Sequence, residues 1–132
     1  MTPCPRFIIF EPVDKIIIIN EDRDFCKTYQ RALQKAGYQI EVYFDGKVGL
    51  THALAQRPKL IILGIMLPTM NGFDVLEVLK RKETTKEIPV VVVSKLSGEE
   101  IEELKHLGVS AFFPKSTCTP EILLKKIKEL LS

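Results

Sequence analysis

Residues 59–73 read KLIILGIMLPTMNGF, and this stretch decides how the chain folds. Its first part, Lys59–Gly64, is apolar at consecutive positions, which is typical of a strand covered by helices on both faces. The Leu67-Pro68 and Asn71-Gly72 pairs that follow indicate a loop. Apolar residues at helical spacing come next, at Phe73, Leu76 and Leu79. The stretch therefore predicts a buried strand, a loop and a helix in succession.

The same alternation continues on both sides of this stretch. Further strands are predicted at Lys15–Asn20, Gln39–Phe44, Ile88–Ser94 and Val109–Pro114, and helices at Asp24–Ala36, Lys47–Gln56, after Gly72, at Gly98–Leu107 and at Pro120–Leu131. Strands that alternate with helices build a parallel sheet through right-handed crossovers. We therefore predict an α/β fold of the flavodoxin-like (βα)5 type, a doubly wound parallel five-stranded sheet in the order 2-1-3-4-5. The second strand looks half exposed and should lie at an edge.

The chain has 132 residues, which suits one globular domain. We assign residues 15–132 to this domain and residues 1–14 to an N-terminal arm. The arm holds an apolar run, Phe7–Phe10, among three prolines. Proline flanking disfavours an interior strand, so the arm either packs on the domain or stays free to exchange in a dimer.

Composition excludes several classes of protein. The net charge is +2, and the lysines at 125, 126 and 128 lie among Glu121 and Glu129 on a helical pattern, so we expect no nucleic-acid contact by this domain. Three cysteines without a CxxC pair argue against a zinc site or a disulfide framework and fit a reducing, cytoplasmic location. The apolar runs are too short to cross a membrane.

Polar residues follow the ends of the central strands. Asn20 and Glu21 follow the first strand, Gly64 and then Met66 the third, Ser94 ends the fourth and Lys115 follows the fifth. Because ligands bind at the carboxyl edge of an open parallel sheet, we expect these residues to meet there. Asp22 and Asp24 are expected to cap the first helix.

Four segments, in order and in register, resemble a response-regulator receiver domain of the CheY type: KIIIINEDRDF, LIILGIMLPTMNGFDVL, PVVVVS and GVSAFFPK. The resemblance extends from Lys15 to Leu131. It implies signalling by a two-component phosphorelay, in which an aspartate at the end of the third strand accepts a phosphoryl group beside a magnesium ion.

The resemblance also shows where this sequence departs from the family. The acceptor aspartate falls on Gly64, and the magnesium-binding acidic pair falls on Asn20 and Glu21. The family's hydroxyl and lysine are retained as Ser94 and Lys115. The aromatic switch position is Phe112, and Ser116 replaces the proline after the lysine.

We therefore expect a degenerate pseudo-receiver without catalytic residues or a required cofactor. Magnesium should bind weakly at best, through Glu21 and the Met66 carbonyl. Lys115 is expected to pair with Glu21, and Ser94 to satisfy a backbone group or to bind a ligand.

The function that follows is a protein–protein interaction module that is independent of phosphorylation and is not an enzyme. Its partner would be a signalling protein, such as a histidine kinase or an output protein. The partner is expected to bind the face formed by the fourth helix, fifth strand and fifth helix. A homodimer could form through this same face. The alternative is residual binding or turnover of a phosphorylated small molecule in the vacated pocket. A flavin-binding protein of the same fold is disfavoured, because the first strand–helix turn is acidic.

Overall fold

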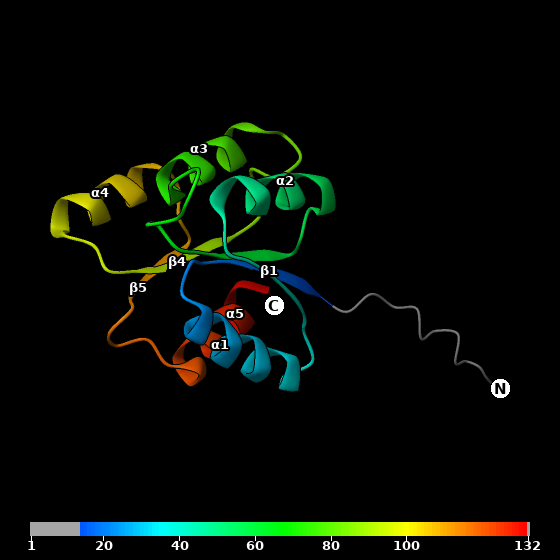
Figure 1. The fold of residues 1–132 in the computed structure, drawn as a ribbon. Coiled ribbons are helices and arrows are strands. Elements are labelled where there is room, and N and C mark those ends of the chain that lie inside the picture. The colour runs from blue at the N-terminus through cyan, green and yellow to red at the C-terminus, as the bar shows by residue number, and fades with distance from the viewer. Residues whose placement is uncertain (1–13, 132) are drawn as a thin grey trace.

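The computed structural model describes residues 14–131, which form five strands and five helices in strict alternation (Figure 1). The strands pair in the order β2-β1-β3-β4-β5, and every pair is parallel. This confirms the predicted flavodoxin-like topology. The elements are β1 (Lys15–Ile19), α1 (Arg23–Lys35), β2 (Gln39–Tyr43), α2 (Gly46–Gln56), β3 (Leu60–Leu63), α3 (Gly72–Arg81), β4 (Val90–Ser94), α4 (Gly98–His106), β5 (Ala111–Pro114) and α5 (Pro120–Leu131).

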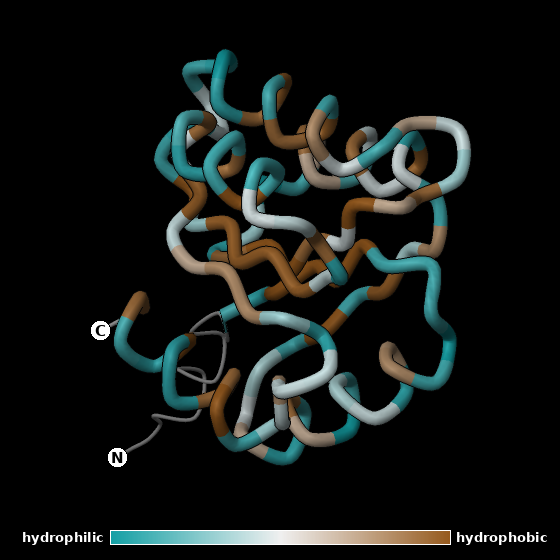
Figure 2. Tube along the Cα trace, turned by 90° about the vertical axis from the view of Figure 1, so that its left-hand side faces the viewer, coloured by the Kyte–Doolittle hydropathy of each residue, from teal (hydrophilic) through white to brown (hydrophobic). Residues whose placement is uncertain are grey.

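The sheet is the middle of three layers, with α2, α3 and α4 on one face and α1 and α5 on the other (Figure 1). Successive strand side chains point to opposite faces, so β1 contributes side chains to the hydrophobic cores on both faces of the sheet. Ile17 and Ile19 pack in the cluster under α2–α4, whereas Ile16 and Ile18 pack in the cluster with α1 and α5. All four are fully buried, which explains the unbroken apolar run. Figure 2 shows the hydrophobic strands between more polar helices.

The edge strands differ from the central ones. β3 and β4 are buried throughout, whereas β2 is half exposed over most of its length, as the sequence predicted. The predicted fourth strand is too long, because β4 begins at Val90. Its predecessor Pro89 has no N–H to donate to a neighbouring strand.

Side chains at the carboxyl edge of the sheet start four of the helices. Asp22 caps α1, Asp45 caps α2, Asn71 caps α3, and Ser97 forms a capping box with Glu100 in α4. Each cap satisfies amide groups that have no partner inside the helix. The first turns of these helices are therefore anchored beside the strand ends, where the candidate site lies.

The predicted arm, residues 1–14, falls outside the described residues except for Asp14. The Asp14 carbonyl accepts a hydrogen bond of 3.0 Å from the Gln39 N–H and thus continues the β1–β2 pairing by one residue. Among residues 14–131, no helix is long and apolar enough to span a membrane.

Candidate functional site

A cavity of about 120 Å³ lies at the carboxyl edge of the sheet, over the ends of β1, β3, β4 and β5. Five of the residues singled out in the sequence meet here, although they come from separate parts of the chain. The lining consists of Asn20, Glu21, Met66, Val93, Ser94, Lys95 and Lys115. Gly64 is not among the lining residues but lies directly beside Asn20, which is.

Gly64 follows β3 and is buried, and its N–H donates to the Ile19 carbonyl across 2.7 Å. A Cβ atom added at Gly64 would lie 2.9 Å from Asn20 Nδ2 and 3.2 Å from Asn20 Cγ. These separations are shorter than ordinary contacts between such atoms. The Asn20 side chain therefore occupies the space in which a side chain at position 64 would begin.

Asn20 is held in this position by the turn after β1. Its side chain is 1% exposed, and its Oδ1 accepts a hydrogen bond of 3.0 Å from the Asp22 N–H. Its Nδ2 has no hydrogen-bond partner within residues 14–131. A buried amide with an unsatisfied donor is unusual in native proteins. One half of this side chain thus organises the turn, while the other half faces Gly64.

Lys115 pairs with Asp22 and not with Glu21, so the pairing predicted from the sequence was wrong. The Lys115 ammonium donates to Asp22 Oδ2 across 2.7 Å, with both side chains partly buried. Glu21 instead is exposed at the bend between β1 and α1. The Asp22 side chain, one position further along the turn, points toward Lys115 at the end of β5, so Lys115 pairs with Asp22.

The Asp22 carboxylate accepts hydrogen bonds from both the start of α1 and Lys115. Its Oδ1 accepts hydrogen bonds of 3.1 Å from both the Asp24 and Phe25 N–H groups at the start of α1, while Oδ2 accepts from Lys115. The Lys115 hydrogen bond, followed by the Phe25 N–H, holds the pKa of Asp22 below its ordinary value of 3.8. Asp22 is therefore the expected cap of α1 and also a link between α1 and β5.

Ser94 ends β4 and is 7% exposed. Its carbonyl accepts a hydrogen bond of 3.2 Å from the Lys115 N–H, but its hydroxyl makes no side-chain hydrogen bond within residues 14–131. Ser94 and Asn20 both line the cavity, so two buried polar residues border one small space.

Met66 and Phe112 differ in their exposure and in their relation to the cavity. Met66 is 70% exposed and lines the cavity from the loop between β3 and α3. Phe112 pairs with Val92 in the sheet and packs, partly buried, against the core under α2–α4. Phe112 is thus a residue of β5 that is not among the residues lining the cavity.

The residues at this edge do not fit a magnesium ion. Hard divalent cations need several oxygen ligands, mostly carboxylates. Asp22 is engaged by Lys115 and by α1, and the Asn20 oxygen is engaged by the Asp22 N–H. Glu21 remains as one exposed carboxylate. Over residues 14–131, no group of three or more His, Cys, Asp or Glu side chains is arranged to hold a metal.

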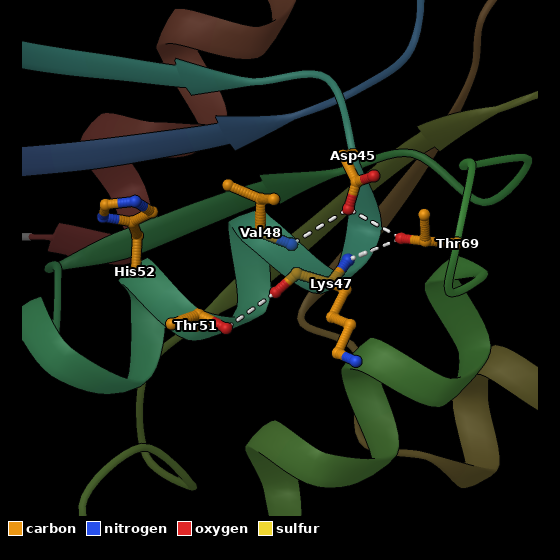
Figure 3. Close-up of a pocket in the computed structure, with 6 residues that line it drawn as sticks. All are labelled: Asp45, Lys47, Val48, Thr51, His52 and Thr69. Carbon is orange, nitrogen blue, oxygen red and sulfur yellow. Dashed lines mark hydrogen bonds between the residues drawn. The ribbon is translucent and has the colours of Figure 1, made fainter.

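A second hollow, of about 330 Å³, was not foreseen from the sequence (Figure 3). It lies along α2 and is lined by Asp45, Lys47, Val48, Thr51, His52 and Thr69. Asp45 Oδ1 accepts from the Val48 N–H across 3.0 Å and from the Thr69 hydroxyl across 2.6 Å. The Asp45-Gly46 pair signals a helix start, but no local pattern marks Thr69 as its partner.

Comparisons with known proteins agree with this architecture. A family model described as the response regulator receiver domain matches residues 16–128. The chain is 37% identical over 82 residues to the DNA-binding dual master transcriptional regulator RpaA of Synechocystis sp., covering 62% of this chain and 34% of that protein. It is 31% identical over 103 residues to the response regulator PleD of Caulobacter vibrioides, covering 76% of this chain and 22% of that protein. The chain thus spans about a third or less of the length of these relatives.

Solved structures match over nearly the full chain. The chemotaxis response regulator CheY4 of Vibrio cholerae superposes with a TM-score of 0.83 at 26% identity, covering 91% of this chain and all of that one. A CheY-like receiver domain protein from Methanospirillum hungatei gives a TM-score of 0.84, also at 26% identity, covering 91% of this chain and 94% of that one. The strand order, the carboxyl-edge cavity and the family match over residues 16–128 together lead to one conclusion: this chain belongs to the response regulator receiver domain family, the signalling modules of two-component systems.

Proposed function

We propose that this receiver domain signals without being phosphorylated, as a protein–protein interaction module of a two-component pathway. The observation that carries the proposal is the close approach of the Asn20 side chain to Gly64. Gly64 has no carboxylate to attack a phosphoryl donor, and the Asn20 amide lies where such a side chain would start. The acceptor is therefore missing, and the space for it is already in use.

The engagement of Lys115 supports the same proposal. In the family that this chain resembles, the lysine and the hydroxyl contact the phosphoryl group on the acceptor. Here the Lys115 ammonium is neutralised by Asp22 at 2.7 Å, so its charge is balanced without any added anion. The ion pair joins the residue after β5 to the cap of α1, so an internal contact takes the place of the one that depends on phosphorylation in an active relative.

The partner would be a signalling protein, either a histidine kinase or an output protein, in the cytoplasm and away from membrane and nucleic acid. We place its contact on the face of α4, β5 and α5. Ile122 on α5 is 44% exposed, and β5 is an edge strand of the sheet. A homodimer through this face would use the same surface. Velocity sedimentation of the purified chain and of its Ile122→Lys variant tests that arrangement.

The acceptor question is tested by treating the purified chain with acetyl phosphate and magnesium and measuring its intact mass. We expect no phosphoryl adduct. The Glu21→Gln variant serves as a matched control, because Glu21 is an exposed carboxylate that lines the cavity. An adduct on the natural chain that survives acid quenching would overturn the proposal. Its loss in Glu21→Gln would identify the residue responsible.

The second candidate is a small anionic ligand, a phosphorylated small molecule, in the cavity. The observation in its favour is that Ser94 and Asn20 present buried polar groups without partners among residues 14–131. Such groups normally find a partner in a native protein. The cavity of about 120 Å³ is smaller than typical ligand pockets, so it would take only a phosphate-sized group. Calorimetry with sugar phosphates and nucleotides tests this, and saturable binding that is abolished in Ser94→Ala and Lys115→Met would favour it.

A further inference from the structure

The helices on the two faces of the sheet differ in charge. Helices α1 and α5, which cover one face, carry seven Lys or Arg and three Asp or Glu residues (Figure 1). Helices α2, α3 and α4, on the other face, carry four Lys or Arg and six Asp or Glu residues. The net charge of +2 therefore conceals a separation of charge across the domain. A surface with an excess of one sign attracts partners of the opposite sign.

The positive charge of α1 is concentrated on one stripe. Lys27, Arg31 and Lys35 follow one another at intervals of four residues, and all three are exposed. Side chains four residues apart are neighbours on a helix, so like charges at this spacing repel each other. The one acid of this helix, Asp24, lies in its first turn and pairs with none of them. Within residues 14–131, no ion pair or side-chain hydrogen bond engages any of the three cations.

Other charged helices form ion pairs within their own length, namely Glu77–Arg81 in α3, Glu102–Lys105 in α4 and Lys126–Glu129 in α5. Helix α1 forms no such pair between its own residues, 23–35. The stripe of like charges thus costs helix stability, and no contact inside the described domain offsets that cost. A local rule that is broken without an internal gain is typical of a functional surface.

An open groove of about 710 Å³ lies beside this stripe, between α1 and the start of α5. Its lining includes Arg31, Ala32 and Lys35 from α1, and Pro120 and Glu121 from α5. Two of the three unpaired cations therefore border the groove on the α1 side, and an acid borders it on the α5 side. The groove as a whole is mixed in charge, with the positive sign in excess.

We propose that the stripe Lys27–Arg31–Lys35 and this groove form a docking surface for an acidic helix of a partner protein. Acidic residues at every fourth position of a helix repeat the spacing of the stripe, about 6 Å between successive charges. A protein segment also supplies a basic side chain to Glu121, whereas a nucleic acid or an anionic membrane surface presents only negative charge to it. The inference rests on the proposed protein-interaction function and adds a surface that the α4, β5 and α5 face does not include.

An NMR titration of the isotope-labelled full chain with a synthetic peptide tests the proposal. The probe is an alanine-rich helix that carries three glutamates at intervals of four residues and one lysine, and its control carries glutamines instead of the glutamates. We expect amide shift changes at Lys27–Lys35 and Glu121 that weaken as NaCl is added, because salt screens exposed charges. The glutamine peptide should not bind. Shift changes that centre on another helix, or that salt leaves unaffected, would overturn the proposal.

A pair of charge reversals localises the contact. Arg31→Glu/Lys35→Glu should weaken peptide binding at least about tenfold, because two attractions become repulsions. Lys125→Glu/Lys128→Glu is the matched control, since it changes the net charge equally at exposed residues of α5 outside the groove lining. It should keep the affinity within about twofold, because distant exposed charges are screened. Equal losses in both variants would reduce the contact to general charge attraction and contradict a site at α1.

The single variant Arg31→Glu separates binding from folding. It places an acid four residues from both Lys27 and Lys35, so the melting temperature should rise while peptide binding falls. A fall in both quantities would show that the stripe is structural. A single-stranded oligonucleotide and phosphatidylglycerol vesicles serve as rival probes, and either one binding as tightly as the acidic peptide would contradict a protein partner. None of these outcomes bears on the acetyl phosphate test, which concerns Gly64.

Discussion

The Lys115 ammonium lies 2.7 Å from Asp22 Oδ2, and this ion pair joins the residue after β5 to the residue that caps α1. The same carboxylate holds the first amides of α1 through its other oxygen. The lysine that the family resemblance assigns to a phosphoryl group is therefore engaged inside the domain. The charge of Lys115 at the carboxyl edge of the sheet is therefore balanced by Asp22 of the same domain.

Asp22→Asn should remove the ion pair and keep the helix cap, because asparagine is as good a cap as aspartate. Since the pair is partly exposed, we expect a loss of about 0.3–1 kcal/mol in the free energy of unfolding at pH 7. The folded-state pKa of Asp22 is lowered, so this stabilisation is present above the ordinary value of 3.8 and is lost as pH falls through the folded-state pKa.

Urea denaturation at pH 7 and in steps below pH about 4 measures this difference, which should vanish in acid. Asp24→Asn is the matched control, because Asp24 lies in the first turn of the same helix but outside the ion pair. Equal losses for both variants at pH 7 would show that Lys115 contributes nothing to stability.

Gly64→Ala should destabilise the fold because its Cβ meets the Asn20 side chain at 2.9 Å. Moving Asn20 away breaks its bond to the Asp22 N–H, so we expect a cost of about 1–2 kcal/mol. Gly98→Ala is the control, since a Cβ there meets nothing within 4 Å. It should be neutral or slightly stabilising in a helix.

A double-mutant cycle with Asn20→Ala separates the clash from general effects. The two substitutions should couple favourably by about 0.5–2 kcal/mol, because a shortened residue 20 makes room for the new methyl group. Thermal or urea unfolding gives each value. Additive losses would mean that Asn20 is not what excludes a side chain at position 64.

Magnesium should have little specific effect on the natural chain. A few millimolar MgCl2 should leave its melting temperature equal to that in NaCl of the same ionic strength, because the described cavity lining contains a single carboxylate, Glu21, and Asp22 is engaged by Lys115 and by the start of α1. The Asn20→Asp/Gly64→Asp variant should instead be stabilised by magnesium, since it restores two carboxylates beside Glu21. A clear rise in the melting temperature of the natural chain would contradict the assignment of a poor metal site.

Thr69→Val should raise the pKa of Asp45 toward its ordinary value. The Thr69 hydroxyl donates to Asp45 across 2.6 Å and is the largest cause of the lowered Asp45 pKa, ahead of the Val48 N–H. Carbon-13 NMR titration of the carboxyl group measures the change. Thr51→Val is the control, because the Thr51 hydroxyl donates to the Lys47 carbonyl instead. An unchanged Asp45 titration in Thr69→Val would show that this bond does not form in solution.

Local patterns determined the architecture. The run Leu60–Leu63 is buried on both faces, and its unbroken apolarity between turn signals is typical of a central strand. Asp22 before the first helical stripe predicted a cap, because capping depends on residues close in sequence. With five such strand–helix units, the handedness of crossovers leaves few strand orders. The positions at the strand ends, Gly64 among them, followed from the same register.

Only the tertiary structure decided which side chains meet at those positions. Lys115 reaches Asp22 and not Glu21, although the two acids are neighbours in the sequence, because the turn after β1 directs one carboxylate toward β5 and the other toward water. The Asn20 amide over Gly64 and the Thr69–Asp45 bond likewise join separate segments. Such contacts depend on the path of the backbone in three dimensions and on the direction of each side chain, which local patterns do not encode.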